Sequence, residues 1–195
     1  MFTIDFSAIR SGKATYADLI SHIGSKDLRP STAKAFEAVR SSISSATDGV
    51  VTFVPHDPQS PEDDERGWTL AHVIAHLTAV LEGDAALASV LARGVQIESG
   101  LRLLYETPWE EIQTVQQVQA RLAESQRICH AYLDTWPEPP HLDTMITLGS
   151  LLGPMNAIGT HMFAIGHVSM HYDQLKEIVR QALIFNRHKN EGKKM

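Results

Sequence analysis

The chain has 195 residues, of which 43% are hydrophobic and 21% charged; this is typical of one globular domain and excludes the disordered and fibrous classes. Its net charge of −6 comes from 17 basic and 23 acidic residues, and the only basic cluster is the tail from Arg187 to Lys194, so we do not expect nucleic acid as a partner. A single cysteine, Cys129, together with the absence of a leader peptide and of any run approaching about 18 apolar residues, predicts a cytoplasmic protein without disulfides or a membrane partner.

The N-terminal part of the sequence is the least regular. We expect residues 1–30 to form an N-terminal extension with one short helix that Gly24 would end. The first long helix is predicted to begin after Pro30 and to stop at Gly49, because its apolar residues recur at helical spacing. The stretch VVTFVP, residues 50–55, has no partner strand and is expected to be an extended connection, followed by a polar loop.

Two further long helices are predicted in the middle of the chain. One opens at Trp68 and ends at Gly94, and its apolar residues mark one buried face. The other is expected to begin at Thr107, which is followed by a proline and a capping-box glutamate, and to stop at Trp136 before a proline-rich loop.

The last predicted helix covers residues 156–183, which contain no proline and keep three- and four-residue apolar spacing. Four long helices without a credible sheet or internal repeat predict an all-α fold, a four-helix bundle. We expect the bundle to span residues 31–185, with residues 186–195 as a frayed basic tail.

Two pairs of histidines at four-residue spacing stand out on the second and the last helix. At about 100° per residue, His167 and His171 lie on one face, one turn apart, where both side chains can reach one ion. On the second helix, His76 flanks the apolar face, whereas His72 is turned about 40° further toward solvent, so His76 is the better candidate. The alternative is that these are partly buried histidines bonded to their neighbours.

The two histidine-bearing stretches resemble the signatures of a known family. GWTLAHVIAHL and GHVSMHYDQL are similar to the tryptophan-to-histidine and His-x3-His-x2-Gln motifs of the DinB/YfiT-like superfamily, and the likeness covers residues 31–183. These are damage-inducible helical proteins, unrelated to the polymerase that shares the label. The sequence departs from the family pattern at Asp173, in its longer leader and in the VVTFVP link.

This resemblance implies a bundle in up-down-down-up order and a divalent ion, zinc or nickel, bound by His76, His167 and His171. Three neutral imidazoles leave a coordination position open, which is typical of a catalytic site and not of a closed structural one. Relatives with known activities use such a site on low-molecular-weight thiols, so the resemblance implies a metal-dependent thiol transferase or a related enzyme with a thiol as cosubstrate. The alternatives are a stress-related metal-binding or interaction protein without turnover, and a bundle with structural histidines.

Other metal and hydrolase sites are excluded by spacing. The His-Glu-x-x-His motif of the zincin proteases and the Gly-x-Ser-x-Gly turn of the α/β-hydrolases are both absent from the sequence. Four polar residues near the three histidines are candidates for contacts with a small-molecule substrate, each with a simpler alternative. These are Gln174 and His72 (alternatively solvated helix positions), Tyr172 (core) and Asn156 (helix cap). A further histidine, His161, falls inside the apolar arc of the last helix, and its part in the site is open.

The last helix also carries a second apolar stripe, Gly159, Phe163, Gly166 and Met170, on the face opposite its main apolar arc. An exposed stripe of this kind indicates a partner surface, and we expect a homodimer. The alternative is that the N-terminal 30 residues fold over it.

Overall fold

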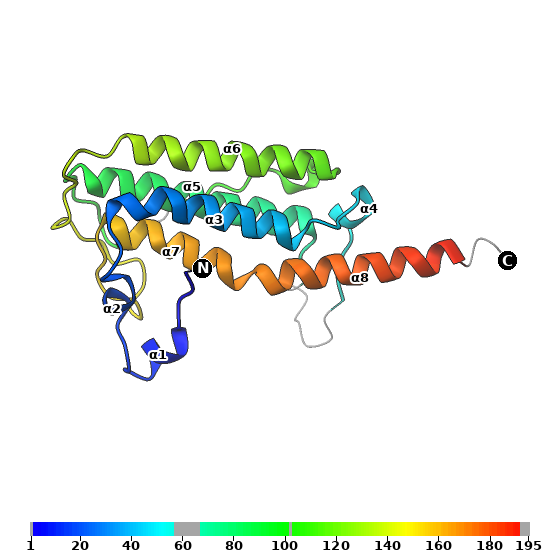
Figure 1. Ribbon diagram of the computed structural model, residues 1–195, viewed down its shortest axis with the longest axis horizontal. Helices are drawn as coiled ribbons and strands as arrows, with labels where there is room; N and C mark the ends of the chain where they lie inside the picture. Colours follow the sequence, from blue (N-terminus) through cyan, green and yellow to red (C-terminus); the bar gives the residue numbers. More distant parts are fainter. Residues whose placement is uncertain (1, 57–66, 102, 192–195) are drawn as a thin grey trace.

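The computed structural model describes residues 2–56, 67–101 and 103–191, and within these ranges it contains helices and no strand (Figure 1). The predicted all-α fold is therefore confirmed. The predicted polar loop falls largely on residues 57–66, outside the described residues. The elements are α1 (Phe6–Arg10), α2 (Tyr16–Ile20), α3 (Ser25–Ser42), α4 (Asp48–Val51), α5 (Leu70–Ala92), the 3-10 helix η2 (Trp109–Glu111), α6 (Val115–Asp134), α7 (Ala157–Met170) and α8 (Tyr172–Glu191).

The long helices lie side by side as a bundle, and contacts between them fix their directions. Arg121 in the first half of α6 donates a hydrogen bond to Thr78 in the first half of α5 (Nε to Oγ1, 3.1 Å). The hydroxyls of Ser89 and Thr135, at the far ends of the same two helices, are 2.9 Å apart. Helices α5 and α6 therefore run parallel, while α3 and α7 run the opposite way (Figure 1).

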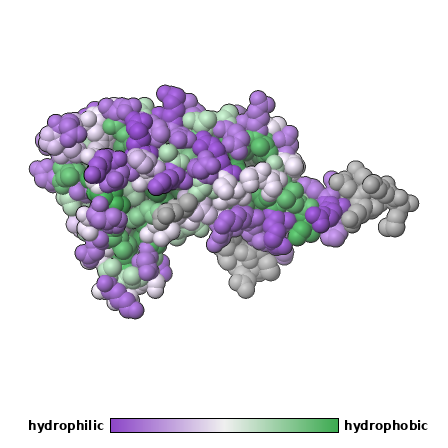
Figure 2. Space-filling view, viewed as in Figure 1, coloured by the Kyte–Doolittle hydropathy of each residue, from purple (hydrophilic) through white to green (hydrophobic). Residues whose placement is uncertain are grey.

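Helix α5 is the most buried element of the bundle and packs against both α6 and α7. By length and composition alone it could span a membrane, although its apolar residues do not form the unbroken run that was expected to mark such a helix. However, 83% of its most apolar window is buried inside the protein. A helix that is apolar all round is typical of the centre of a bundle, and the face in Figure 2 is largely hydrophilic with smaller apolar patches.

The first long helix begins earlier than predicted, at Ser25. The side chain of Asp27 accepts a hydrogen bond from the backbone N–H of Gly24 (2.9 Å), so the N–H of the residue that caps α3 has a partner. Pro30 consequently lies inside α3, where it costs one backbone hydrogen bond. The VVTFVP stretch also differs from the prediction, because its first two residues belong to the short helix α4.

The predicted helix start at Thr107 is wrong. The turn after it forms only the 3-10 helix η2, and α6 begins at Val115. Thr114 and Gln117 form a complete capping box there: each side chain accepts a hydrogen bond from the other's backbone N–H, at 3.2 Å and 3.0 Å. Two capping signals seven residues apart compete in this stretch, and the second one starts the helix.

The predicted last helix is divided in two at His171. The N–H of His171 bonds to the carbonyl of Val168, three residues back, at 3.1 Å. This tighter turn interrupts the α-helical pattern, and α7 and α8 point in different directions in Figure 1. Helix α8 continues to Glu191, into the segment expected to be frayed, and residues 192–195 lie outside the described residues.

The N-terminal segment covers part of the second apolar stripe of α7. A Cβ added at Gly159 would lie 3.0 Å from Ile20, and one added at Gly166 would overlap Ile4. The two glycines therefore let residues 2–20 lie close to α7. Met170, at the end of the stripe, is 57% exposed. The stripe thus gives a homodimer little support, and the homodimer stays a prediction.

His161 is buried in the bundle and is not part of the histidine pair that follows it. Its Nε2 is 2.8 Å from the hydroxyl of Thr32 on α3, and that hydroxyl is 2.8 Å from the carbonyl of Leu28. Its Nδ1 has no hydrogen-bond partner in the part of the chain that the structure describes. Burial lowers the pKa of His161 to about 4, so the ring is neutral at pH 7 and serves the core.

We predict that His161 makes the metal-free protein less stable in acid. The pKa is about 4 in the folded state and 6.5 in the unfolded chain, so the unfolded state binds the proton more readily. The free energy of unfolding should therefore fall as pH drops from about 6.5 to about 4, by on the order of 3 kcal/mol from this residue. Urea titrations with a chelator present should show a shallower pH dependence in His161→Gln. The exposed His141→Gln is the control, and equal slopes in both variants would refute the prediction.

Candidate metal centre

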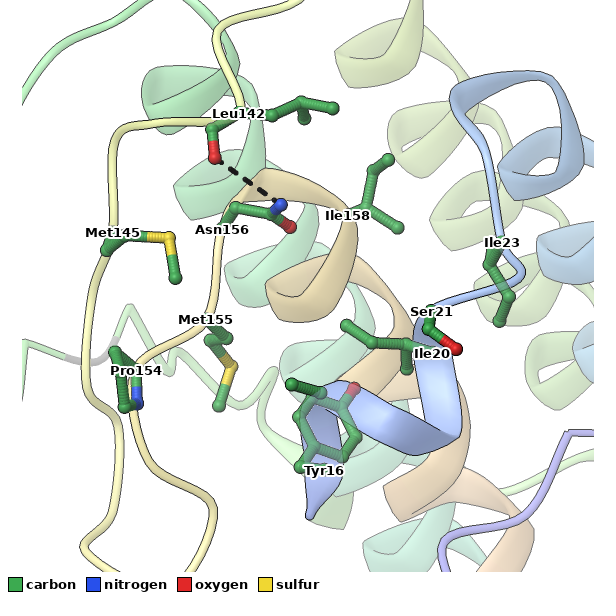
Figure 3. Close-up of a pocket in the computed structure, with 11 residues that line it drawn as sticks. Tyr16, Ile20, Ser21, Ile23, Leu142, Met145, Pro154, Met155, Asn156 and Ile158 are labelled. Carbon is green, nitrogen blue, oxygen red and sulfur yellow. Dashed lines mark hydrogen bonds between the residues drawn. The ribbon is translucent and has the colours of Figure 1, made fainter.

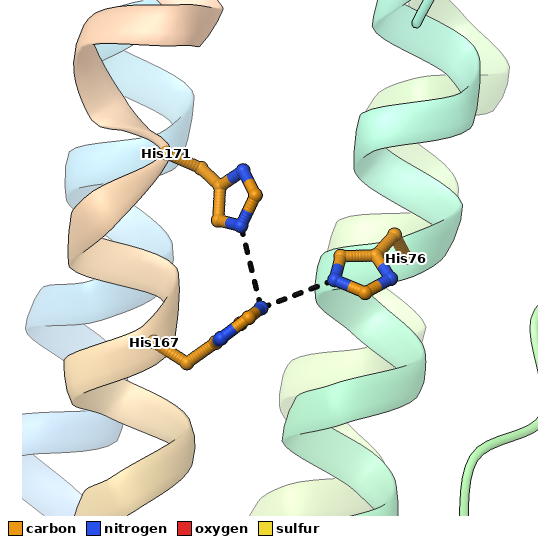
Figure 4. Close-up of side chains that lie close together, drawn as sticks. All are labelled: His76, His167 and His171. Carbon is orange, nitrogen blue, oxygen red and sulfur yellow. Dashed lines mark hydrogen bonds between the residues drawn. The ribbon is translucent and has the colours of Figure 1, made fainter. Parts of the chain in front are cut away.

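Three histidines from two neighbouring helices converge at one point of the bundle (Figure 4). His76 lies in the second turn of α5, His167 in the last turn of α7, and His171 at the junction of α7 and α8. The Nε2 atom of His167 is 3.1 Å from that of His76 and 3.3 Å from that of His171. The structure thus brings together the three residues that the resemblance implied as ligands, close enough to hold a metal ion.

The spacing of these nitrogens suits a metal ion. Zinc-to-imidazole bonds are about 2.0–2.1 Å long, and a tetrahedral angle between two such bonds places their nitrogens about 3.3–3.4 Å apart. The two measured separations, 3.1 Å and 3.3 Å, are close to this value. His76 and His171 are only 8% and 6% exposed, so an ion held by these nitrogens would be largely shielded from water.

Glu106 is a member of the site that the sequence did not reveal. It lies on the extended segment before η2, and its Oε1 is 2.8 Å from Nδ1 of His76. A carboxylate accepts hydrogen bonds, so this contact is a hydrogen bond when the ring carries its proton on Nδ1, and the lone pair of Nε2 then points toward His167. No motif or helical spacing connects residue 106 to either histidine helix, so only the fold brings them together.

Gln174 is hydrogen-bonded to His171 as Glu106 is to His76. Its Oε1 accepts a hydrogen bond from Nδ1 of His171 at 2.7 Å, which places the lone pair of that ring on Nε2, 3.3 Å from Nε2 of His167. Gln174 is therefore half-buried and bonded to a ring of the site, which differs from the solvated position that was its simpler alternative, and its contact with a substrate stays a prediction. The spacing of three residues on one helical turn is the sequence signal for this contact.

His72 lies beside the three histidines without joining them. Its ring is stacked between those of Trp68 (centroids 3.8 Å apart) and Trp109 (4.7 Å). Its side chain is 19% exposed and that of His76 is 10% exposed, so His72 lies further toward solvent than His76, as expected, without being a fully solvated position. Burial lowers the pKa of His72 more than the carboxylate of Glu106, 3.5 Å from its Nε2, raises it. The ring is therefore a neutral part of an aromatic stack.

The remaining two candidates make the contacts of their simpler alternatives, Asn156 as a helix cap and Tyr172 packed against the core, and a substrate contact of either stays a prediction. Asn156 caps α7: its Oδ1 accepts a hydrogen bond from the N–H of Gly159 (3.1 Å), and its Nδ2 is 3.5 Å from the carbonyl of Leu142 (Figure 3). It lines a separate pocket of about 260 Å³ at the start of α7, away from His171 at the other end. Burial raises the pKa of Tyr172 to about 12, and its hydroxyl has no hydrogen-bond partner among the described residues.

The thiol of Cys129 does not contribute to this centre. The residue lies on α6 and is fully buried, and burial raises its pKa to about 12. A protonated, inaccessible thiol is neither a metal ligand nor a nucleophile at neutral pH. The candidate donor set is therefore three imidazole nitrogens, which would leave a bound ion at least one further position for an outside ligand.

Comparison with known proteins links this site to one family. The sequence model of the DinB superfamily matches residues 31–175, a range that includes all three histidines. No curated protein and no solved structure matches the chain.

The geometry predicts which histidines a metal ion needs. Elemental analysis of protein purified without metal-affinity chromatography should find about one divalent ion per chain. His76→Ala, His167→Ala and His171→Ala should each reduce the metal content to near zero, because each removes one of three donors. His72→Ala should retain most of the metal, since that ring supplies no donor atom. A result in which His72→Ala empties the site and His76→Ala does not would contradict this assignment.

Proposed function

The chain belongs to the DinB superfamily, and on this premise we propose that it binds one divalent metal ion, zinc or nickel, through His76, His167 and His171. The convergence of the three Nε2 atoms carries this proposal. Three neutral rings gathered in the interior would be costly without a shared partner, and a cation is the partner that all three lone pairs can face at once.

We further propose that the protein is a thiol transferase or a related enzyme that acts on a small electrophile. A divalent ion in this site would supply Lewis acidity, which lowers the pKa of a thiol at neutral pH. The chain's own contribution is to hold the rings, through Glu106 and Gln174, and to leave one position open. Because Cys129 is buried and protonated, the thiol has to be a low-molecular-weight compound from solution.

A second candidate function is metal binding without turnover, in a stress-related or interaction protein. The low exposure of His76 and His171 favours it, because buried ligands restrict the approach of a substrate. Both functions use the same proposed ligands, so metal content does not distinguish the enzyme from the binding protein. Saturable turnover with a thiol would distinguish them, because only the enzyme shows it.

The enzyme proposal predicts thiol-dependent conjugation by the metal-loaded protein. In the reaction, the thiol loses its proton, its sulfur bonds to the electrophilic carbon, and the leaving group departs with its electron pair. Incubation with a panel of small thiols and chloronitrobenzenes, followed by absorbance and chloride release, should show turnover that a chelator abolishes. His167→Ala should lower it at least about 100-fold, since it removes the ion.

The controls locate the chemistry. Circular dichroism should show that His167→Ala keeps its helices, and His141→Ala, an exposed histidine distant in sequence from the ligands, should keep full activity. Equal turnover with and without metal would place the reaction elsewhere. No turnover across the panel, despite stoichiometric metal, would favour the binding protein.

A further inference from the structure

The segment between α5 and η2 returns along α5 and carries Glu106 to His76. Gly83 on α5 marks a close approach of the two, because a Cβ added there would overlap the carbonyl oxygen of Leu103. The backbone of the segment therefore lies directly on the helix, three residues before Glu106. Any larger residue at position 83 would displace this backbone, so the placement of Glu106 depends on a glycine seven residues from the ligand.

The carboxylate of Glu106 contacts two histidine rings of α5. Its Oε1 is 2.8 Å from Nδ1 of His76, and its Oε2 is 3.5 Å from Nε2 of His72, one helical turn earlier. His72 cannot swing away, because Trp68 and Trp109 stack on its two faces. One carboxylate thus bridges two rings of α5, and only one of these rings faces the other histidines.

A neutral imidazole carries one proton, and the nitrogen that carries it cannot bind a metal. With the proton on Nε2, His76 would present a donor to His167 and no lone pair to an ion. We propose that Glu106 is a positioning residue that keeps this proton on Nδ1, fixes the ring and so makes His76 a competent ligand. A carboxylate behind a histidine also raises the basicity of that ligand. The effect on metal binding rests on the proposed function, whereas the effect on the proton stands without it.

The first test needs no metal. In metal-free protein labelled with ¹⁵N, at pH 8, long-range ¹H–¹⁵N correlation spectra report which ring nitrogen of His76 is protonated. Wild-type protein should show the proton on Nδ1. Glu106→Gln keeps an oxygen that accepts this proton's hydrogen bond and should retain the preference, while Glu106→Ala should lose it. The matched control is Glu110→Ala, which removes a nearby exposed carboxylate that has no bond to His76 and should change nothing.

The second test measures affinity. Competition with a chromophoric chelator should show that Glu106→Ala binds zinc about 10–100-fold more weakly than wild type. Glu106→Gln should lie between them, and Glu110→Ala should equal wild type. Gly83→Ala, which alters no bond of the site, should shift both the His76 proton and the affinity in the direction of Glu106→Ala, with helicity retained.

The outcomes are decisive. A wild-type His76 with its proton on Nε2, or Glu106→Ala with an unchanged proton position and affinity, overturns the proposal. If Gly83→Ala leaves both the His76 proton position and the zinc affinity unchanged, the close approach at Leu103 has no role in placing Glu106. If the proton moves in Glu106→Ala but the wild-type protein binds no divalent ion, Glu106 keeps its positioning role and the proposed metal-binding function fails.

Discussion

The packing of α5 against α7 is the contact on which the candidate site depends. His76 lies near the start of α5 and His167 near the end of α7, so the two rings meet only because the helices run in opposite directions. The apolar character of α5 on all sides explains why it is held in the centre of the bundle. The same property that hides α5 from water therefore brings His76 to the other two histidines of the candidate site.

Burying several polar rings in such an interior has a free-energy cost that the surrounding side chains offset. Glu106 and Gln174 each accept a hydrogen bond from a ring of the site, and Thr32 serves His161 deeper in the core. Buried polar groups with hydrogen-bond partners make a core more specific. Buried polar groups without partners destabilise the fold. The three histidines of the site differ from His161 in one respect: their lone pairs converge instead of pointing to separate partners.

Much of this arrangement could be predicted from the sequence, because helical periodicity is local. The all-α fold and the spacing of His167 and His171 follow from residues within a few turns of each other. Glu106 could not be predicted, since thirty residues and a folded segment separate it from His76. The helix start at Val115 was missed because two capping signals compete, and the stacking of His72 between two tryptophans was missed because Trp109 belongs to another element.

The break at His171 places this residue between two helices, unlike His76 and His167, which lie within α5 and α7. Helices α7 and α8 are separated by this single residue and have different axes. Helix α8 is the longer of the two and reaches beyond the bundle in Figure 1. Gln174 lies on α8 and is hydrogen-bonded to the ring of His171, whereas His167 lies on α7. Four residues of α8 are buried in the core, Leu175, Ile178, Val179 and Ala182. Their packing therefore fixes the tilt of α8 and, through His171, the width of the gap between the rings of His171 and His167.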